Sequence, residues 1–253
     1  YNGYGQLGDN STTQRDTPVT VNGISNATDI SAGGNTSCAV EGGAVKCWGW
    51  NNKSQLGNNS TTDSSTPVTV LGLSAAAVKV ANTGHMSCAV LVTGALECWG
   101  GILAVPRIAE PVMGFESGVV DVDGGGGTVV RDVCVTTDQN KVICIEYPHG
   151  RYLADTSKPV PVIDMAGTYT QLSRGCATKE GGGVRCWGDN ESEAFYGSAP
   201  HLYEYFPQDK PSYSAVPLDL NSSQTHSWMV TSGGVVECWG YDSYARASAD
   251  GVA

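Results

Sequence analysis

A pair of cysteines separated by a short turn-forming stretch recurs along the chain and constrains the fold more than any other feature. The first copy reads CAVEGGAVKCWG. The closing cysteines of successive copies lie 42 to 52 residues apart. A period of this length, filled with short β-type runs and glycine-rich turns, is typical of the blades of a β-propeller. Five copies are recognisable, at residues 38–49, 88–100, 134–146, 176–188 and 228–240.

Each repeat carries signals for four short strands. Residues 17–21 and 66–72 are β-branched runs led by Thr-Pro, which suits an edge strand. Residues 27–33 alternate in character and end in glycine, and the runs around residues 38–40 and 44–48 flank a Gly-Gly pair that suits a two-residue hairpin turn. The sequence therefore predicts an all-β fold, a β-propeller of four-stranded blades that forms a single domain over residues 1–253.

The hairpin predicts disulfides. Counting outward from Gly42 and Gly43 places Cys38 opposite Cys47, where facing side chains are close enough to bond. The other repeats have one more residue between their cysteines, which a three-residue or bulged turn can absorb. Each bridge should contribute about 2–3 kcal/mol. Paired free thiols are the alternative, and the spacing does not suit zinc. The predicted bridges are Cys38–Cys47, Cys88–Cys98, Cys134–Cys144 and Cys176–Cys186.

The ninth cysteine, Cys238, has no cysteine partner in its repeat, because the expected position holds Trp228. We expect Cys238 to be a buried free thiol. The alternative is a bond to sequence that lies outside these 253 residues.

Composition excludes several partners. The net charge is −11 and the estimated pI is 4.6, and no lysine or arginine cluster opposes this charge locally. Nucleic acid and anionic membranes are therefore poor candidates. No run approaches the about 18 consecutive apolar residues of a membrane-spanning helix. The chain starts without methionine or a signal peptide, so we expect the natural start to lie upstream.

Two loops carry a family resemblance. CWGWNNKSQLGNNST at residues 47–61 and YNGYGQLGDNST at residues 1–12 resemble the W-G-x-N-x-x-G-Q-L-G signature of the regulator of chromosome condensation repeat family. His85 and His226 occupy the histidine position of that family's A-G-x-x-H-S-x-A-L segment. The resemblance is strong over residues 1–100 and weak over residues 101–170.

The resemblance implies a β-propeller, usually of seven blades. Only five repeats are visible here, and the chain ends on an overlapping copy of the loop with which it begins. Either the five repeats close a small ring, or the sequence is a segment of a longer chain. The overlap favours the segment.

No enzyme motif is present: the sequence has no G-x-S-x-G elbow, no phosphate-binding P-loop and no H-E-x-x-H. Residues 121–128, DVDGGGGT, lack the spaced carboxylates of a calcium loop and are interpreted as a glycine-rich turn. The four histidines, at 85, 149, 201 and 226, are scattered. We therefore predict no catalytic, metal or cofactor-binding residues and no cofactor.

Eight asparagines begin N-x-S/T sequons, which together with the cysteine pairs favour an oxidising secretory route. Asn10, Asn58 and Asn59 lie in polar loops and are the preferred acceptors, although Asn58 and Asn59 would crowd each other. The eight are Asn10, Asn26, Asn35, Asn52, Asn58, Asn59, Asn190 and Asn221.

Residues 194–217 replace the repeat's G-Q-L-G loop with a longer, aromatic-rich insertion. Aromatic side chains on a loop of a rigid scaffold are typical of recognition surfaces. The alternative is that these rings fold back onto the blade as a small satellite core. The candidate binding residues are Phe195, Tyr196, Tyr203, Tyr205, Phe206 and Tyr213.

These observations favour a non-catalytic interaction or structural module outside the cell or on its surface, which binds protein or carbohydrate and can self-assemble. A secreted inhibitor is the alternative, since a β-lactamase inhibitor is similar in fold. The resemblance also implies guanine-nucleotide exchange, but four registered cysteine pairs would have no use in a reducing compartment. We expect no nucleic-acid partner and no membrane insertion.

Overall fold

A computed structural model describes the following residues: 1–101, 107–124, 132–146, 161–165, 168–173, 176–180, 182–189, 203–209, 217–222 and 226–240. Across these residues the chain forms antiparallel sheets, turns and loops, with no helix. The all-β prediction is confirmed. The chain divides into two compact units: the first contains Tyr1–Gly124, and the second contains Gly125–Glu146 and Val160–Ala253.

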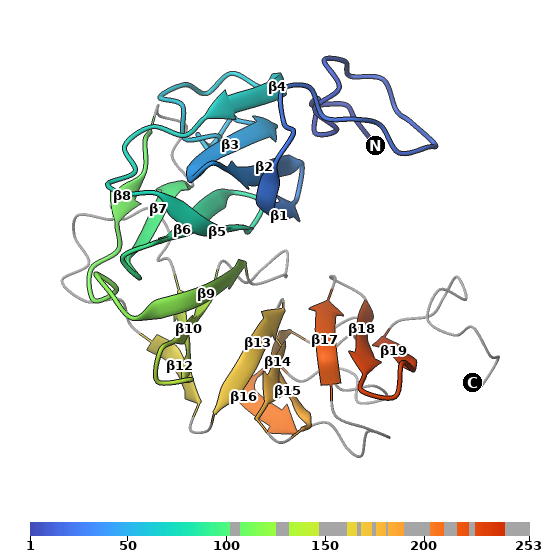
Figure 1. The fold of residues 1–253 in the computed structure, drawn as a ribbon, viewed down its shortest axis with the longest axis vertical. Helices are drawn as coiled ribbons and strands as arrows, with labels where there is room; N and C mark the ends of the chain where they lie inside the picture. Colours follow the sequence, from blue (N-terminus) through green and yellow to red (C-terminus); the bar gives the residue numbers. More distant parts are fainter. Residues whose placement is uncertain are drawn as a thin grey trace. The chain divides into compact units, whose positions relative to one another are not determined.

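The first unit contains two four-stranded sheets in which neighbours in sequence are neighbours in space (Figure 1). The first sheet is β1 (Ala27–Gly33), β2 (Thr36–Glu41), β3 (Ala44–Gly49) and β4 (Ser64–Thr69). The second is β5 (Ala77–Asn82), β6 (Met86–Leu91), β7 (Leu96–Gly100) and β8 (Glu110–Pro111), and β9 (Val119–Gly124) follows.

The second unit repeats the same up-and-down order. Its strands are β10 (Asp132–Thr137), β11 (Val142–Glu146), β12 (Pro161–Met165), β13 (Tyr169–Ser173), β14 (Cys176–Lys179), β15 (Val184–Asp189) and β16 (Tyr203–Asp209). They are followed by β17 (Pro217–Ser222), β18 (His226–Thr231) and β19 (Val236–Gly240). Strands β13 to β16 form a four-stranded sheet, and β17 to β19 form a sheet of three strands.

The hairpin prediction is confirmed. Gly42 and Gly43 form the turn between β2 and β3 with φ of 59° and 81°, and Cys38 lies opposite Cys47 in the register. The hairpin with one more residue between its cysteines uses a three-residue turn, since the N–H of Leu91 donates to the carbonyl of Ala95. The last residue of such turns has positive φ, which glycine and asparagine tolerate. These residues are Gly94, Asn140, Gly182 and Gly234.

The observed strand bounds agree in part with those predicted from the sequence. Strand β1 covers the predicted residues 27–33, and β4 begins two residues before the predicted residues 66–72 and ends at Thr69. The prediction of a strand at residues 17–21 is wrong. The same Thr-Pro-Val-Thr-Val motif is a strand in β4 because β3 lies beside it. Residues 17–21 have no neighbouring strand among the described residues, so no ladder forms.

Three of the predicted disulfides are present in the structure: Cys38–Cys47, Cys88–Cys98 and Cys134–Cys144, each with Cα atoms 4.0 Å apart. Cys176 is also disulfide-bonded, and the register places Cys186 opposite it. The free-thiol alternative is therefore wrong for the three described pairs.

The first two sheets pack face to face. The sulfurs of Cys38 and Cys47 lie in a buried cluster with Val80 of β5 and Trp99 of β7. The strands β1 and β5 are also joined by polar contacts, because the Asp29 carboxylate accepts a 2.8 Å hydrogen bond from the N–H of Val80. Each disulfide of this unit therefore stabilises a sheet from within a buried core.

The expectation of a buried thiol at Cys238 is wrong. Cys238 is a free thiol and it is exposed. It lies on β19, at the edge of the three-stranded sheet, and its register partner Trp228 is 39% exposed. The two residues share a face of this sheet, and a side chain on an uncovered sheet face remains in water whatever its apolar character.

Candidate binding site

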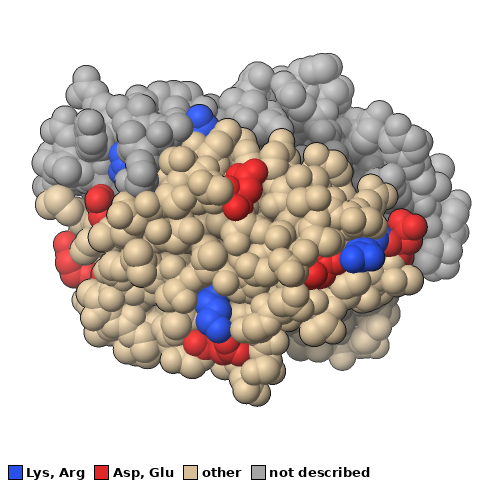
Figure 2. Space-filling model, turned by 90° about the horizontal axis from the view of Figure 1, so that it is seen from above, with Lys and Arg blue, Asp and Glu red and all other residues tan. Residues whose placement is uncertain are grey.

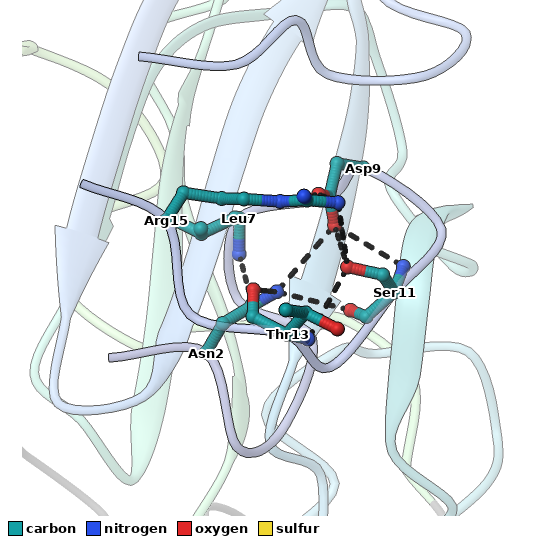
Figure 3. A network of polar contacts seen from close by, with 6 residues as sticks. All are labelled: Asn2, Leu7, Asp9, Ser11, Thr13 and Arg15. Carbon is teal, nitrogen blue, oxygen red and sulfur yellow. Dashed lines mark hydrogen bonds and ion pairs between the residues drawn. The ribbon is translucent and has the colours of Figure 1, made fainter. Parts of the chain in front are cut away.

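The loop that precedes the first sheet is built around one asparagine. The side-chain N–H₂ of Asn2 donates to Asp9 Oδ1 (3.4 Å) and to the carbonyls of Ser11 (3.1 Å) and Thr13 (3.0 Å). Its Oδ1 accepts a 2.9 Å bond from the N–H of Leu7. Figure 3 shows these partners converging on the Asn2 carboxamide. One side chain thus holds an entire loop that has no regular secondary structure.

The loop between β3 and β4 repeats this arrangement around Asn51. Its N–H₂ group donates to Asn58 Oδ1 (3.3 Å) and to the carbonyls of Ser60 (3.1 Å) and Thr62 (2.9 Å). Its Oδ1 accepts from the N–H of Leu56 at 2.9 Å. Asparagine suits the position because one carboxamide supplies two donors and an acceptor. Asn58 therefore takes the place that Asp9 holds in the first loop.

The Gln-Leu-Gly part of each loop contacts the tryptophan of the following hairpin. The carbonyl of Gln6 accepts a 2.9 Å bond from Trp48 Nε1, and the carbonyl of Gln55 accepts the same bond from Trp99. Gly57 has a φ of +63°, and a Cβ there would lie 2.7 Å from the Trp99 ring. The Trp-Gly motif and the Gln-Leu-Gly motif therefore contact each other in the folded protein.

The first loop is also fixed at its surface. The Asp9 carboxylate accepts a 2.7 Å bond from the Ser11 hydroxyl and pairs with Arg15 at 2.9 Å. These contacts, the Ser11 bond first, lower the pKa of Asp9 below its ordinary value.

On this rigid frame, four rings form a continuous surface feature that we call the aromatic row: Tyr1, Tyr4, Trp50 and His85. Successive ring centroids are 6.2, 5.8 and 5.6 Å apart. Tyr1 and His85 are exposed, whereas Tyr4 and Trp50 are half-buried. The rings come from the first loop, the residue after β3, and the turn between β5 and β6.

The loop that follows Trp50 carries two charged residues. Asp63 is exposed, and its Oδ1 accepts a 2.8 Å bond from the N–H of Asn51, the residue after Trp50. Lys53 lies three residues after Trp50 on the same loop and is half-buried. The loop that follows Trp50 therefore carries one carboxylate and one ammonium group.

Charged groups are scattered elsewhere on the visible surface. Figure 2 shows one face on which uncharged side chains cover most of the described surface and the lysine and arginine side chains lie singly. Among the described residues, no group of three histidine, cysteine, aspartate or glutamate side chains could hold a metal ion. No helix long and apolar enough to cross a membrane occurs in the described part of the chain.

The aromatic row was missed by the sequence analysis. Its members lie in three separate segments, and each fits a repeat motif by itself. The available signal was the equivalence of Tyr1 and Trp50, which both precede the central asparagine of a loop. His85, which occupies the histidine position of the repeat, contributes its ring to the row.

The insertion proposed as a binding loop remains a prediction. Phe195, Tyr196 and Tyr213 lie outside the described residues. The remaining three candidates are on β16, whose side chains are likewise outside the description; they are Tyr203, Tyr205 and Phe206.

The sequons differ in their surroundings. The Oδ1 atom of Asn35 accepts from Gln6, and that of Asn58 accepts from Asn51, so both side chains are engaged within the fold. Asn190 lies outside the described residues, as does the side chain of Asn221 on β17. The exposed sequon asparagines are Asn10, Asn26, Asn52 and Asn59.

Comparisons with known proteins agree with this architecture. Residues 1–40 and 43–91 match the family model of the regulator of chromosome condensation (RCC1) repeat. No curated protein matches the sequence. Among solved structures, human WBSCR16 is similar with a TM-score of 0.72 at 16% identity, over 91% of this chain and 66% of that chain.

Prp20p from Saccharomyces cerevisiae is similar with a TM-score of 0.66 at 19% identity, over 83% of this chain and 56% of that chain. Its structure is described together with its binding to Gsp1p and histones. Yeast RCC1 (Prp20) bound to Kap60 has a TM-score of 0.66 at 18% identity, over 83% and 55%. This chain therefore spans less than two thirds of the length of these proteins.

The fold is thus that of a β-propeller built from four-stranded antiparallel blades. RCC1 repeats are matched within the first 91 residues, and the fold of the chain is similar to that of RCC1-type propellers.

Proposed function

We propose that this chain is a non-catalytic interaction module that works outside the cell or on its surface, as a disulfide-stabilised, glycosylated propeller that binds protein or carbohydrate. The observation that carries the proposal is the aromatic row, a set of contacting rings, exposed or half-buried, that come from three segments of the chain. Propellers position such loops at the ends of their strands, where they are accessible to partners.

The disulfides support the proposed location. Cys38, Cys47, Cys88 and Cys98 are each at most 1% exposed, and they lie in cross-strand pairs whose register requires no distortion of the ladder. Buried structural disulfides persist in oxidising compartments and are rare in the cytosol. This chemistry favours a secreted protein over a nuclear exchange factor or another intracellular regulator.

A protein partner is favoured over a carbohydrate. The structures of Prp20p and yeast RCC1 are described with protein partners, Gsp1p, histones and Kap60, so this type of propeller is known as a protein-binding scaffold. Fold similarity at this level of identity does not transfer the partner. A secreted inhibitor would be one kind of protein-binding module, and it would bind its target through the same surface, the aromatic row.

The first test is non-reducing peptide mapping by mass spectrometry of the protein purified from its natural source. We expect the four cysteine pairs as bridges and glycans on Asn10 and Asn59, which are exposed sequon asparagines in the two asparagine-centred loops. Free thiols throughout and unmodified asparagines would overturn the extracellular assignment. Peptides from beyond Tyr1 or Ala253 would establish that the propeller continues.

A second candidate role, self-assembly, is favoured by one position. Ile30 on β1 is 75% exposed, whereas Val80, at the equivalent place on β5, is 4% exposed because the first sheet covers it. The face of β1 that carries Ile30 is thus built like a blade-packing face. Docking of a blade from a second copy on this face would allow an assembly at the cell surface or a filament.

A further inference from the structure

We propose that the aromatic row binds lysine and arginine side chains of a partner protein. The inference rests on the proposed interaction function and deepens it by naming the site and the chemical class of the partner.

The geometry of the row favours a cation over a flat ligand. Planes of successive rings are inclined by 74°, 43° and 62°, so the row presents faces and edges in different directions. A sugar chain that stacks along several rings needs them to lie nearly parallel. An ammonium or guanidinium group needs only one ring face within about 6 Å, and tryptophan provides the best one. Trp50 is at the centre of the row.

The negative net charge of the chain also favours a cationic partner. With 25 acidic and 14 basic residues, the protein attracts cationic segments over a distance. On the loop that follows Trp50, the N–H of Asn51, the next residue, donates a hydrogen bond to the exposed Asp63 carboxylate. Lys53 on the same loop opposes a cationic ligand, so its removal should strengthen binding.

Two residues of the row, Trp50 and Tyr4, are held by hydrogen bonds of their backbone before a ligand binds. The N–H of Trp50 donates to the carbonyl of Asn35 at 2.8 Å, and the Trp50 carbonyl accepts from the Thr36 hydroxyl at 2.9 Å. The N–H of Tyr4 donates to Gln6 Oε1 at 3.0 Å. Because these positions are held by the fold, binding does not require the loops to become ordered.

Isothermal titration calorimetry with three probes tests the inference: a short peptide rich in lysine and arginine, the same peptide with glutamine at every basic position, and a neutral oligosaccharide. The natively purified protein should bind the basic peptide only, and more weakly as salt rises. In recombinant protein with its disulfides formed, Trp50→Ala should weaken binding about tenfold and Asp63→Asn about threefold, whereas Lys53→Ala should tighten it about threefold.

Trp228→Ala is the matched control, since Trp228 is a partly exposed tryptophan outside the row, and it should leave the affinity unchanged. Thermal unfolding midpoints equal to the unmodified protein show that a variant is folded. A lack of binding to the basic peptide, or an equal loss in Trp228→Ala, overturns the inference.

Other results separate this inference from the proposed function. If Lys53→Ala weakens binding, or if the oligosaccharide binds through Trp50, the partner class is wrong while the interaction function stands. If the basic peptide binds as expected but peptide mapping finds free thiols, the site is correct and the extracellular assignment falls.

Discussion

Asn2 and Asn51 each organise a loop that forms no strand of its own, and each does so with both ends of one carboxamide. The two residues lie 49 positions apart, and their partners lie at matching positions. Both side chains are buried. A polar atom left without a partner there would have lost the hydrogen bonds that it makes to water in the unfolded chain, which would destabilise the fold. The loops, and with them the aromatic row, depend on these single residues.

We predict that Asn51→Asp destabilises the protein by about 3 kcal/mol or more, because it replaces a donor with a carboxylate oxygen that faces three oxygen acceptors. The neighbouring exposed residue is the matched control, and Asn52→Asp should change stability by less than about 0.5 kcal/mol. Chemical denaturation measures both. Equal stabilities for the two variants would show that the carboxamide does not hold the loop.

The hydrogen bonds of Glu41 make the stability of the protein depend on pH. Its carboxylate accepts hydrogen bonds from Lys46 Nζ at 2.6 Å and from the N–H groups of Ser25 and Asn26 at 2.8 and 3.0 Å. These contacts, the Lys46 bond first, lower the pKa of Glu41 from its ordinary value of 4.5 to about 2. Since the folded-state pKa lies below that of the unfolded chain, the stabilisation is present above about pH 4.5 and disappears as the pH falls to about 2.

Glu41→Gln should therefore lower the thermal unfolding midpoint near neutral pH, and the difference from the unmodified protein should shrink between about pH 4.5 and pH 2. The midpoints of both proteins are measured at a series of pH values across this range. A difference that stays constant through the whole range would mean that the carboxylate charge contributes nothing.

At the scale of the element, the hairpin with its disulfide is the repeated unit of stability. The register of β2 and β3 was predictable because a two-residue Gly-Gly turn determines which residues face each other. The strand at residues 17–21 was predicted wrongly because β propensity alone does not supply a neighbouring strand. Hairpin register is a local property, whereas an edge strand depends on its partner.

Replacing both Cys38 and Cys47 with alanine should destabilise the protein by about 2–3 kcal/mol, since the bridge restricts a loop of about ten residues in the unfolded chain. Cys238→Ala is the control, and because Cys238 is exposed and unbonded it should change stability by less than about 0.5 kcal/mol. Denaturant titrations under non-reducing conditions compare the three proteins. Similar losses for both variants would indicate that the bridge is not the source of the stability.

At the scale of the whole molecule, equivalent faces of different blades differ in exposure: a face that is buried in one blade is exposed in another. Ile30 and Val80 occupy equivalent positions, and only Val80 is covered. On the last sheet, Trp228 and Cys238 occupy the positions that Cys38 and Cys47 fill in the first sheet, where both sulfurs are buried. Such faces are the natural places for another blade to dock.

If a second copy docks on β1, the protein should self-associate at high concentration and Ile30→Asp should prevent it. Val92→Asp is the control, because Val92 is 62% exposed in the turn between β6 and β7, away from any blade-packing face. Sedimentation velocity over a range of concentrations measures the association. Loss of association in both variants, or a monomer at every concentration without substitution, would rule out docking on β1.

The sequence by itself determined the features that depend on neighbours along the chain: the repeat, the all-β class, the hairpin turns and the cysteine pairs. Turn geometry and strand alternation act over a few residues, so they can be predicted from composition and spacing. The tertiary structure alone decided which side chains are exposed and which rings meet. The aromatic row joins residues up to 84 positions apart. The exposure of Cys238 depends on whether another layer covers its sheet, because burial is a property of packing between segments and is not encoded in any one of them.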